Sequence, residues 1–173
     1  EEPVPNANAK EAEKLLDQAG YLKKADGFRY KDGKKVTLTA LSYDRLPEIP
    51  LAVQATQASL KQIGIDVKIR TVEVGSIAAA EDYSFTPYTM VATPVGDPYP
   101  FFKSSLASDG SVNLGKYKSA KVDRLIQALA IEGNQEKRQE LSKDLQREIK
   151  EDLPISFLVT FKVAVIMNEI GRA

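Results

Sequence analysis

The hydrophobic residues of this chain repeat with two periods, one typical of helices and one typical of strands. In residues 12–19 they recur at helical spacing, between Asn8 as a capping residue and Gly20 as a stop signal. Residues 36–43 instead alternate threonine with aliphatic side chains. The first part of the chain is therefore predicted to form a helix and then a strand.

The next residues are predicted to form a helix, a strand, a short helix and a third strand. Residues 47–63 carry one apolar stripe that ends before Gly64, and residues 65–72 alternate strictly. Together with the first strand they form a unit long enough for a right-handed crossover between parallel strands. A short helical stretch around residues 77–80 and a third strand over about residues 85–92 complete this region.

Helical patterns dominate the second half. Residues 98–107 are predicted to be helical, and two longer helices begin after the capping residues Ser119 and Asn134. The apolar, β-branched run of residues 155–165 is predicted to return to the same sheet as one or two strands. We therefore expect a single α/β domain over residues 1–173, with a mixed, largely parallel sheet of four or five strands and helices packed on it.

The amino-acid composition excludes several classes of function. Lysine and arginine balance aspartate and glutamate at 24 each, which disfavours nucleic acids and anionic membranes as partners. Cysteine and histidine are absent, so thiol nucleophiles, imidazole bases and the usual zinc ligands are missing. We expect no catalytic residue, no cofactor and no metal site.

The ends of the chain also carry information. The longest apolar run, residues 155–167, is too short and too polar to span a membrane, so we expect a soluble chain. The sequence begins at Glu1, without an initiating methionine or a leader. This start favours an excised piece of a longer protein.

The most constrained segment is Thr93–Leu106, which places three prolines, a glycine and a carboxylate just before a helical segment. Asp97 precedes Pro98 and is well suited to cap that helix. Alternatively, its carboxylate faces a cleft and pairs with a cationic group of a ligand or contributes to the site of a metal chelate. Tyr99 is the aromatic residue of this segment that we expect to be exposed, because the phenylalanines after it suit a core.

Two further segments are candidates for ligand contact. Tyr43 and Arg45 follow the first predicted strand, and ligands gather at the carboxyl ends of strands in open α/β sheets. Arg45 can hold a carboxylate with two hydrogen bonds, and a solvated surface arginine is the alternative. Asn113 and Tyr117 lie in a glycine-containing loop without a phosphate-binding pattern. They can donate hydrogen bonds to a ligand, and a plain turn is the alternative.

Six sequence blocks occur in an order that resembles one protein family. The blocks are residues 8–21, 36–43, 55–67, 96–98, 117–126 and 152–156. In this order they resemble the family 5 extracytoplasmic solute-binding proteins, which serve importers of peptides, nickel complexes and related solutes. The resemblance covers nearly the whole chain.

The resemblance implies a fold, a function and a location. Members of the family have two lobes that close over the solute, and this chain resembles the C-terminal lobe alone. It would form one wall of a cleft that captures a short peptide or a nickel chelate for an ATP-driven membrane permease, with no chemistry performed. It would act outside the cytoplasm, in the periplasm or lipid-anchored at the outer face of the membrane. By position, the ligand-facing residues fall on Thr93, Val95, Asp97 and Tyr99, with Tyr43, Arg45, Asn113 and Tyr117 as companions.

The chain also departs from the family pattern. Many members carry a tryptophan before the aspartate, whereas Thr93–Val95 stand here and the chain contains no tryptophan. Stacking on a solute must therefore come from tyrosine or from the missing lobe. The Asp97 loop leans toward the nickel branch, but without histidine this lobe cannot ligate nickel through imidazole, so a nickel chelate and a short peptide both remain open.

Other expectations stay open from the sequence. One alternative function is a ligand-sensing or protein-interaction module that reuses this lobe, and a less favoured one is a hydrolase that uses Asp97 or Glu81. Without its partner lobe the chain should expose apolar surface near Ile49, Leu51 and residues 163–167, which predicts self-association.

Overall fold

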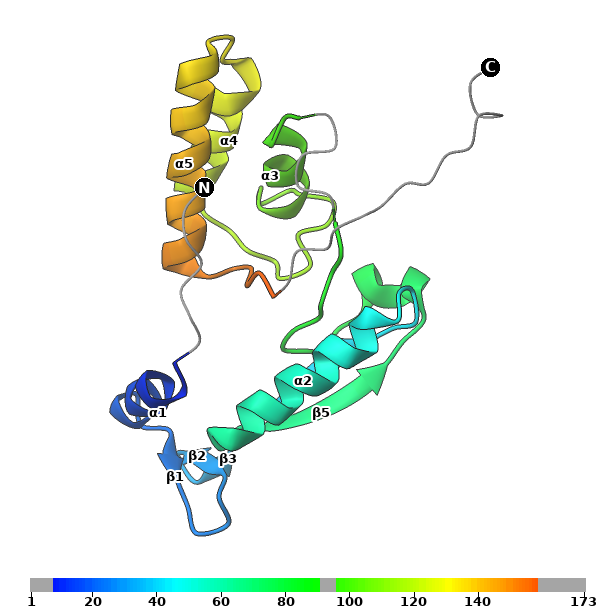
Figure 1. Cartoon of the computed structure of the whole chain (residues 1–173), viewed down its shortest axis with the longest axis vertical. Coiled ribbons are helices and arrows are strands. Elements are labelled where there is room, and N and C mark those ends of the chain that lie inside the picture. Colours follow the sequence, from blue (N-terminus) through cyan, green and yellow to red (C-terminus); the bar gives the residue numbers. More distant parts are fainter. Residues whose placement is uncertain (1–7, 91–95, 159–173) are drawn as a thin grey trace, which may run out of the picture.

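The computed structural model describes residues 8–90 and 96–158. Figure 1 shows these two segments as two bodies, which we call the N-terminal half (residues 8–90) and the C-terminal half (residues 96–158). The N-terminal half contains all the strands that are described, and the C-terminal half contains three helices. The candidate site depends on how these halves meet.

The chain begins with helix α1 (Ala9–Gln18), as predicted. The Asn8 side chain accepts a hydrogen bond from the Glu11 backbone N–H at 3.1 Å, and Gly20 ends the helix with a left-handed φ of 83°. Strands β1 (Leu22–Lys23), β2 (Arg29–Lys31) and β3 (Lys34–Lys35) then form a small antiparallel sheet. The pattern missed this sheet, because strands of two or three residues are too short to show a period.

The predicted crossover is present in the middle of the N-terminal half. Strands β4 (Thr37–Ser42) and β5 (Asp66–Thr71) pair in parallel, and helix α2 (Glu48–Gln62) connects them. Figure 1 shows α2 lying along β5. The buried core between helix and sheet consists of Ala40, Val53, Ile65 and Val67.

The α/β class, with parallel strands and packed helices, is confirmed, and its strands fall into two sheets rather than one. The predicted third strand is reduced to a single parallel bridge between Ala40 and Phe85, and residues 91–92 lie outside the described part. The predicted return strand is wrong for residues 155–158, which carry no strand. There Leu153 adopts a left-handed φ of 50° at the end of the last helix, so the chain changes direction. The rest of that run lies outside the described part.

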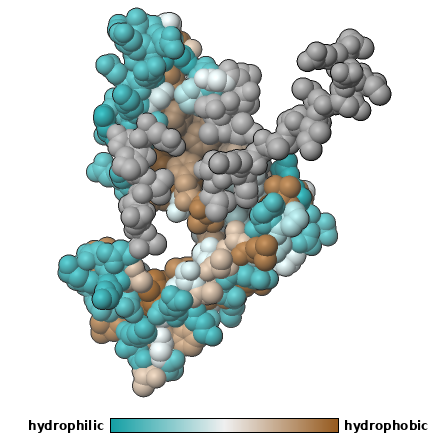
Figure 2. All heavy atoms as spheres, viewed as in Figure 1, coloured by the Kyte–Doolittle hydropathy of each residue, from teal (hydrophilic) through white to brown (hydrophobic). Residues whose placement is uncertain are grey.

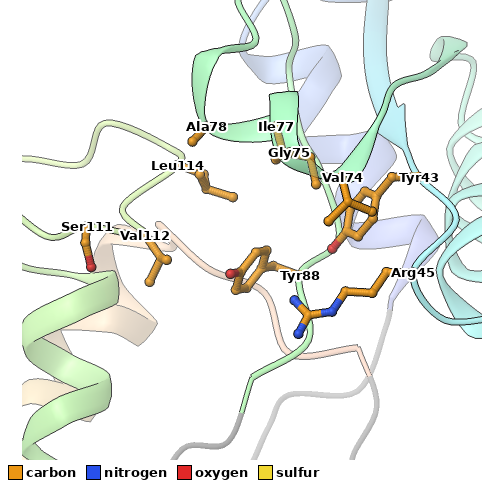
Figure 3. Close-up of a pocket in the computed structure, with 10 residues that line it drawn as sticks. All are labelled: Tyr43, Arg45, Val74, Gly75, Ile77, Ala78, Tyr88, Ser111, Val112 and Leu114. Carbon is orange, nitrogen blue, oxygen red and sulfur yellow. The ribbon is translucent and has the colours of Figure 1, made fainter.

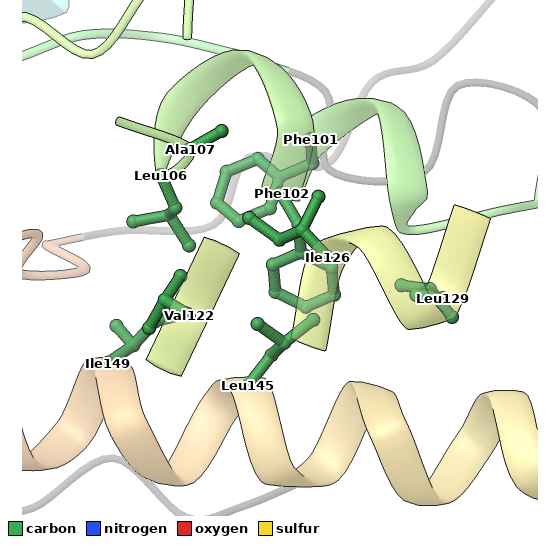
Figure 4. Close-up of a cluster of buried hydrophobic side chains, with 9 residues drawn as sticks. All are labelled: Phe101, Phe102, Leu106, Ala107, Val122, Ile126, Leu129, Leu145 and Ile149. Carbon is green, nitrogen blue, oxygen red and sulfur yellow. The ribbon is translucent and has the colours of Figure 1, made fainter. Parts of the chain in front are cut away.

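The C-terminal half packs three helices around one apolar cluster. They are α3 (Tyr99–Ser105), α4 (Ala120–Ile131) and α5 (Gln135–Asp152). Ser119 and Asn134 cap α4 and α5 as predicted, each by accepting a backbone N–H on its side chain. Figure 4 shows phenylalanines of α3 pointing toward α4 and α5, and both Phe101 and Phe102 are buried in this cluster.

The halves meet where the 3-10 helix η1 (Val74–Ala79) faces the loop of residues 111–117. The Tyr83 hydroxyl donates to the Leu114 carbonyl at 2.7 Å, and Leu114 packs against a buried cluster that includes Ile49 and Ile77. Ile49 is only 3% exposed, so its predicted exposure is wrong. Leu51 is 63% exposed as predicted, and Figure 2 shows hydrophobic surface near this end of the N-terminal half.

Candidate ligand-binding site

A small pocket opens where the two halves meet, next to the carboxyl end of β4. Its volume is about 110 Å³, and Figure 3 shows its walls. The N-terminal half supplies two residues that follow β4, part of η1 and Tyr88, and the C-terminal half supplies one loop. The lining residues are Tyr43, Arg45, Val74, Gly75, Ile77, Ala78, Tyr88, Ser111, Val112 and Leu114.

Tyr43 forms a fixed part of this wall. Its side chain is buried, and its hydroxyl donates a hydrogen bond to the Pro87 carbonyl at 2.9 Å. Burial raises the pKa of the Tyr43 hydroxyl, so it stays protonated and keeps donating at neutral pH. The hydrogen bond joins the end of β4 to the segment that carries Tyr88, and it therefore fixes two lining residues at once.

Arg45 is the only charged side chain in the described lining of the pocket. It is exposed, and in Figure 3 its guanidinium extends toward the Tyr88 ring. Within residues 8–90 and 96–158 no ion pair or hydrogen bond of this guanidinium is observed. The sequence prediction that Tyr43 and Arg45 lie together at a site is consistent with this geometry.

Sequence reasoning missed Tyr88 and the tip of the loop. Tyr88 is 40% exposed and carries the second hydroxyl of the pocket. Ser111, Val112 and Leu114 form the facing wall. The sequence analysis pointed to the same loop, but it named Asn113 and not these three residues as a ligand contact. The tyrosine-rich stretch from residue 83 to residue 88 was the available signal, but its place beside Tyr43 depends on the hydrogen bond between the Tyr43 hydroxyl and the Pro87 carbonyl, 44 positions away in the chain.

Asn113 and Tyr117 hold the loop rather than line the pocket. The Asn113 amide nitrogen donates to the Ala107 and Tyr117 carbonyls at 3.1 and 2.7 Å, and its oxygen accepts the Tyr117 backbone N–H at 2.9 Å. The Tyr117 hydroxyl hydrogen-bonds to the Asp152 carboxylate at the end of α5. These contacts position the loop tip, so both residues act on the pocket through its wall.

Asp97 lies away from the pocket and is held within the chain. Its Oδ1 accepts the Tyr99 backbone N–H at 2.9 Å, so its side chain bonds to the start of α3 as a capping residue would, although Pro98 and not Asp97 stands at the N-cap position. Arg138 Nη2 lies 2.8 Å from both carboxylate oxygens. The Tyr99 N–H, followed by the Arg138 guanidinium, lowers the pKa of the Asp97 carboxyl.

The remaining candidates lie elsewhere. Tyr99 packs against the C-terminal core and borders a more open groove of about 320 Å³, where Lys103 pairs with Asp109. Thr93 and Val95 lie outside the described residues. The described part of the chain contains no cluster of acidic side chains suited to a metal ion. In the same residues no helix has the length and hydrophobicity needed to cross a membrane.

Comparison with known proteins identifies the family. A sequence model of the bacterial extracellular solute-binding proteins, family 5 Middle, matches residues 1–113. The chain belongs to this family. The nickel-binding protein NikA of Staphylococcus aureus is 28% identical over 145 residues, which cover 83% of this chain and 29% of NikA.

Two solved structures show the same fold. NikA of Staphylococcus aureus in complex with Ni(L-His)2 matches with a TM-score of 0.76 and 25% identity over 89% of this chain and 32% of that one. The oligopeptide-binding protein AppA of Bacillus subtilis, in complex with a nonapeptide, matches with a TM-score of 0.71 and 26% identity over 88% of this chain and 32% of that one. The chain thus spans about a third of the length of these family members.

Proposed function

We propose that this chain forms one wall of the cleft in which the receptor of an ABC importer captures its solute, a short peptide or a nickel chelate. The observation that carries the proposal is a pocket at the carboxyl end of β4 in a chain that belongs to a solute-binding family. The lobe would receive the solute together with a second lobe and present it to the membrane permease. Its place of action would be outside the cytoplasm.

The size of the pocket supports a half-site. Sites that enclose a whole small molecule usually measure about 300–1,000 Å³, and this pocket has about 110 Å³. That volume accommodates an end group of a solute rather than an entire peptide or chelate. A second lobe that closes over the pocket would supply the remaining contacts, in line with the 29% of NikA that this chain matches.

The ligand contacts that we propose are Tyr43 and Arg45, assisted by Tyr88. Asp97, Asn113 and Tyr117 instead stabilise the surrounding loops, because their polar atoms are engaged within the chain.

The role is binding rather than catalysis. A hydrolase that used Asp97 as its general acid would need that carboxyl to hold a proton near neutral pH, whereas the Tyr99 N–H and the Arg138 guanidinium lower the pKa of Asp97. Glu81 is exposed and lies outside the pocket. Neither residue therefore offers the acid and base pair that the alternative function requires.

The test uses the full-length product of the gene that encodes this chain. Native mass spectrometry should detect a co-purifying peptide or nickel complex, and calorimetry should show binding of an alanine tripeptide or of Ni²⁺ with L-histidine. The 173-residue chain alone should bind the same probe at least about tenfold more weakly, because half a cleft leaves the solute in water. Absence of any binding to the full-length protein, or equal affinity for the chain alone, would refute the proposal.

A further inference from the structure

We infer that the outer face of helix α2 is a self-association surface, on which a second copy of this protein docks with its own α2 running antiparallel. The docking is independent of the solute and of the pocket. Three properties of α2 support it. Its exposed side chains are almost all uncharged, its sequence is complementary to itself in an antiparallel pair, and its two charges have opposite signs at opposite ends.

The outer face of α2 lacks the charges that a solvated helix face usually carries. Charged side chains occur only near its two ends, at Glu48 and Lys61, whereas α5 has charged residues in every turn. Leu51 is 63% exposed on this face. Figure 2 shows pale and brown surface along α2, and mostly teal surface over α5. The exposed, uncharged residues between the two ends are Leu51, Gln54, Ala55, Ala58 and Ser59.

The neighbouring strand extends this surface. Figure 1 shows β5 running beside α2. Ile69 of β5 is 38% exposed, and the alternation of a strand places it on the same face as Val67, which packs in one buried cluster with Val53 of α2. An apolar side chain at the sheet edge therefore adds to the exposed surface of the helix.

The spacing of the exposed residues makes α2 complementary to itself. One stripe recurs at intervals of three and four residues and consists of Glu48, Leu51, Ala55, Ala58 and Gln62. A two-fold axis at Ala55, the middle of the stripe, places Leu51 of one copy against Ala58 and Ser59 of the other. Each large side chain then meets small ones, which lets the helix axes approach to about 8 Å. Two-fold dimers require such a self-complementary surface.

The charges at the ends of α2 favour the antiparallel orientation. In an antiparallel pair, Glu48 of one copy lies at the end that carries Lys61 of the other, and the two helix dipoles are opposed. A parallel pair would instead bring like charges together at both ends. Electrostatics therefore selects the same arrangement as the packing of large on small side chains.

The size of the surface sets the strength of the contact. Helix α2 has 15 residues and is therefore about 22 Å long. A contact of this length buries less than the roughly 1,200–2,000 Å² of a stable interface. We therefore expect a weak, reversible dimer with a Kd on the order of 100 µM.

The first experiment is disulfide trapping in the full-length protein. This chain contains no cysteine, and any cysteine elsewhere in the protein is first replaced by serine. Ala55→Cys should form a linked dimer on mild oxidation, because position 55 lies on the two-fold axis. Ala58→Cys should not link to itself, since the two copies of position 58 are about 9 Å apart along the helices, but it should link to Leu51→Cys in a mixture. Ala130→Cys, at an exposed alanine of α4, is the control.

The second experiment measures dimerisation of the full-length protein by sedimentation equilibrium. Ala55→Glu and Ala55→Lys should each weaken it by about tenfold or more, because the dimer would bring two like charges together. An equimolar mixture of these two variants should associate at least as well as the wild type, which a merely structural defect would not allow. The control Ala130→Glu should change nothing. All these variants should unfold near the wild-type temperature, since both alanines are exposed and glutamate and lysine are good helix formers.

Three results would overturn this docking mode. The first is a wild-type protein that stays monomeric up to about 1 mM, ten times the expected Kd. The second is equal dimerisation of Ala55→Glu and Ala130→Glu, which would place the contact elsewhere. The third is trapping of Ala55→Cys no faster than that of Ala130→Cys, which would show that another part of the protein covers α2. None of these results affects the proposed function, which is tested by solute binding.

Discussion

The ion pair between Asp97 and Arg138 offers a direct test of what the proline loop does. Its two residues lie 41 positions apart in the chain, so the pair ties the start of α3 to α5. Arg138 also donates through Nη1 to the Leu129 and Glu132 carbonyls at 2.6 and 2.9 Å, at the end of α4. One guanidinium therefore connects all three helices of the C-terminal half.

The free energy that this ion pair contributes depends on how exposed its two side chains are and on the geometry of their contacts. The Asp97 and Arg138 side chains are 41% and 24% exposed, so solvent screens part of their attraction. A fully exposed pair contributes about 0.2–1 kcal/mol, and the two short contacts to Arg138 place this pair near the upper end. We expect a coupling free energy of about 1 kcal/mol. Arg138→Met alone should cost about 2–3 kcal/mol, because it also removes the hydrogen bonds to the two α4 carbonyls.

The assay is a double-mutant cycle with Asp97→Asn, Arg138→Met and the combined variant, each unfolded in urea and followed by circular dichroism. Asparagine keeps an acceptor for the Tyr99 N–H, so the cycle isolates the charge. A coupling free energy within about 0.3 kcal/mol of zero would refute the stabilising role. Asp97→Asn should also leave probe affinity within about twofold of wild type, and a large loss of affinity with intact stability would show that Asp97 contacts the solute.

The contribution of Asp97 to stability should depend on pH in a defined direction. The pKa of Asp97 is lowered from its usual value of 3.8, so its ionised form stabilises the fold above that pH and this contribution disappears as the pH falls through the lowered pKa. The free-energy difference between wild type and Asp97→Asn should therefore be constant above about pH 5 and shrink below pH 3.8. A difference that grows with acidification would contradict the assigned contacts.

Three further changes test the fold and the pocket wall. Arg29→Met should destabilise the protein by about 2–4 kcal/mol in urea unfolding, because the buried Arg29 side chain donates to the carbonyls of Tyr21 and Ile63, which then lose their donor. Leu145→Ala should cost about 2–5 kcal/mol by leaving a cavity in the three-helix core, whereas the control Ile131→Ala, at a side chain that is 88% exposed, should stay within about 0.5 kcal/mol. Asn113→Ala should accelerate hydrogen exchange of the Tyr117 amide and weaken probe binding, and unchanged exchange would refute its role in the loop.

Local patterns predicted much of the fold because the responsible interactions lie close together in sequence. The caps at Asn8 and Ser119 and the stripe of α2 involve residues three or four apart, and each was predicted from its neighbours. Strands β1 to β3 are too short to show a periodic pattern. In addition, their residues Lys35 and Arg29 are held by partners that are distant in sequence.

The site was only partly predictable, because some of its residues are placed by contacts between distant parts of the sequence. Tyr43 and Arg45 follow from a general rule about the ends of parallel strands, and the structure places both at one pocket. Tyr88 lies in the same half and joins them through the hydrogen bond from the Tyr43 hydroxyl to the Pro87 carbonyl, 44 positions away in the chain. Val112 joins them because the two halves pack together, and no local pattern encodes either arrangement. Asp97 was predicted to be either a cap or a contact, and the choice depends on Arg138, whose position requires the complete three-helix core.

The polar contacts around the pocket suggest how so small a site can contribute to affinity. Tyr43 is bonded to the Pro87 carbonyl, Tyr83 to the Leu114 carbonyl, and Asn113 to both ends of its loop. These bonds fix the walls before a solute arrives, so binding does not have to order them, and the entropy lost on association is smaller. Arg45 differs because its long side chain is exposed, and it would lose rotamer freedom on contact with a solute. A fixed pocket with one adjustable cation suits a receptor lobe that holds one end of a solute while a second lobe closes on the other.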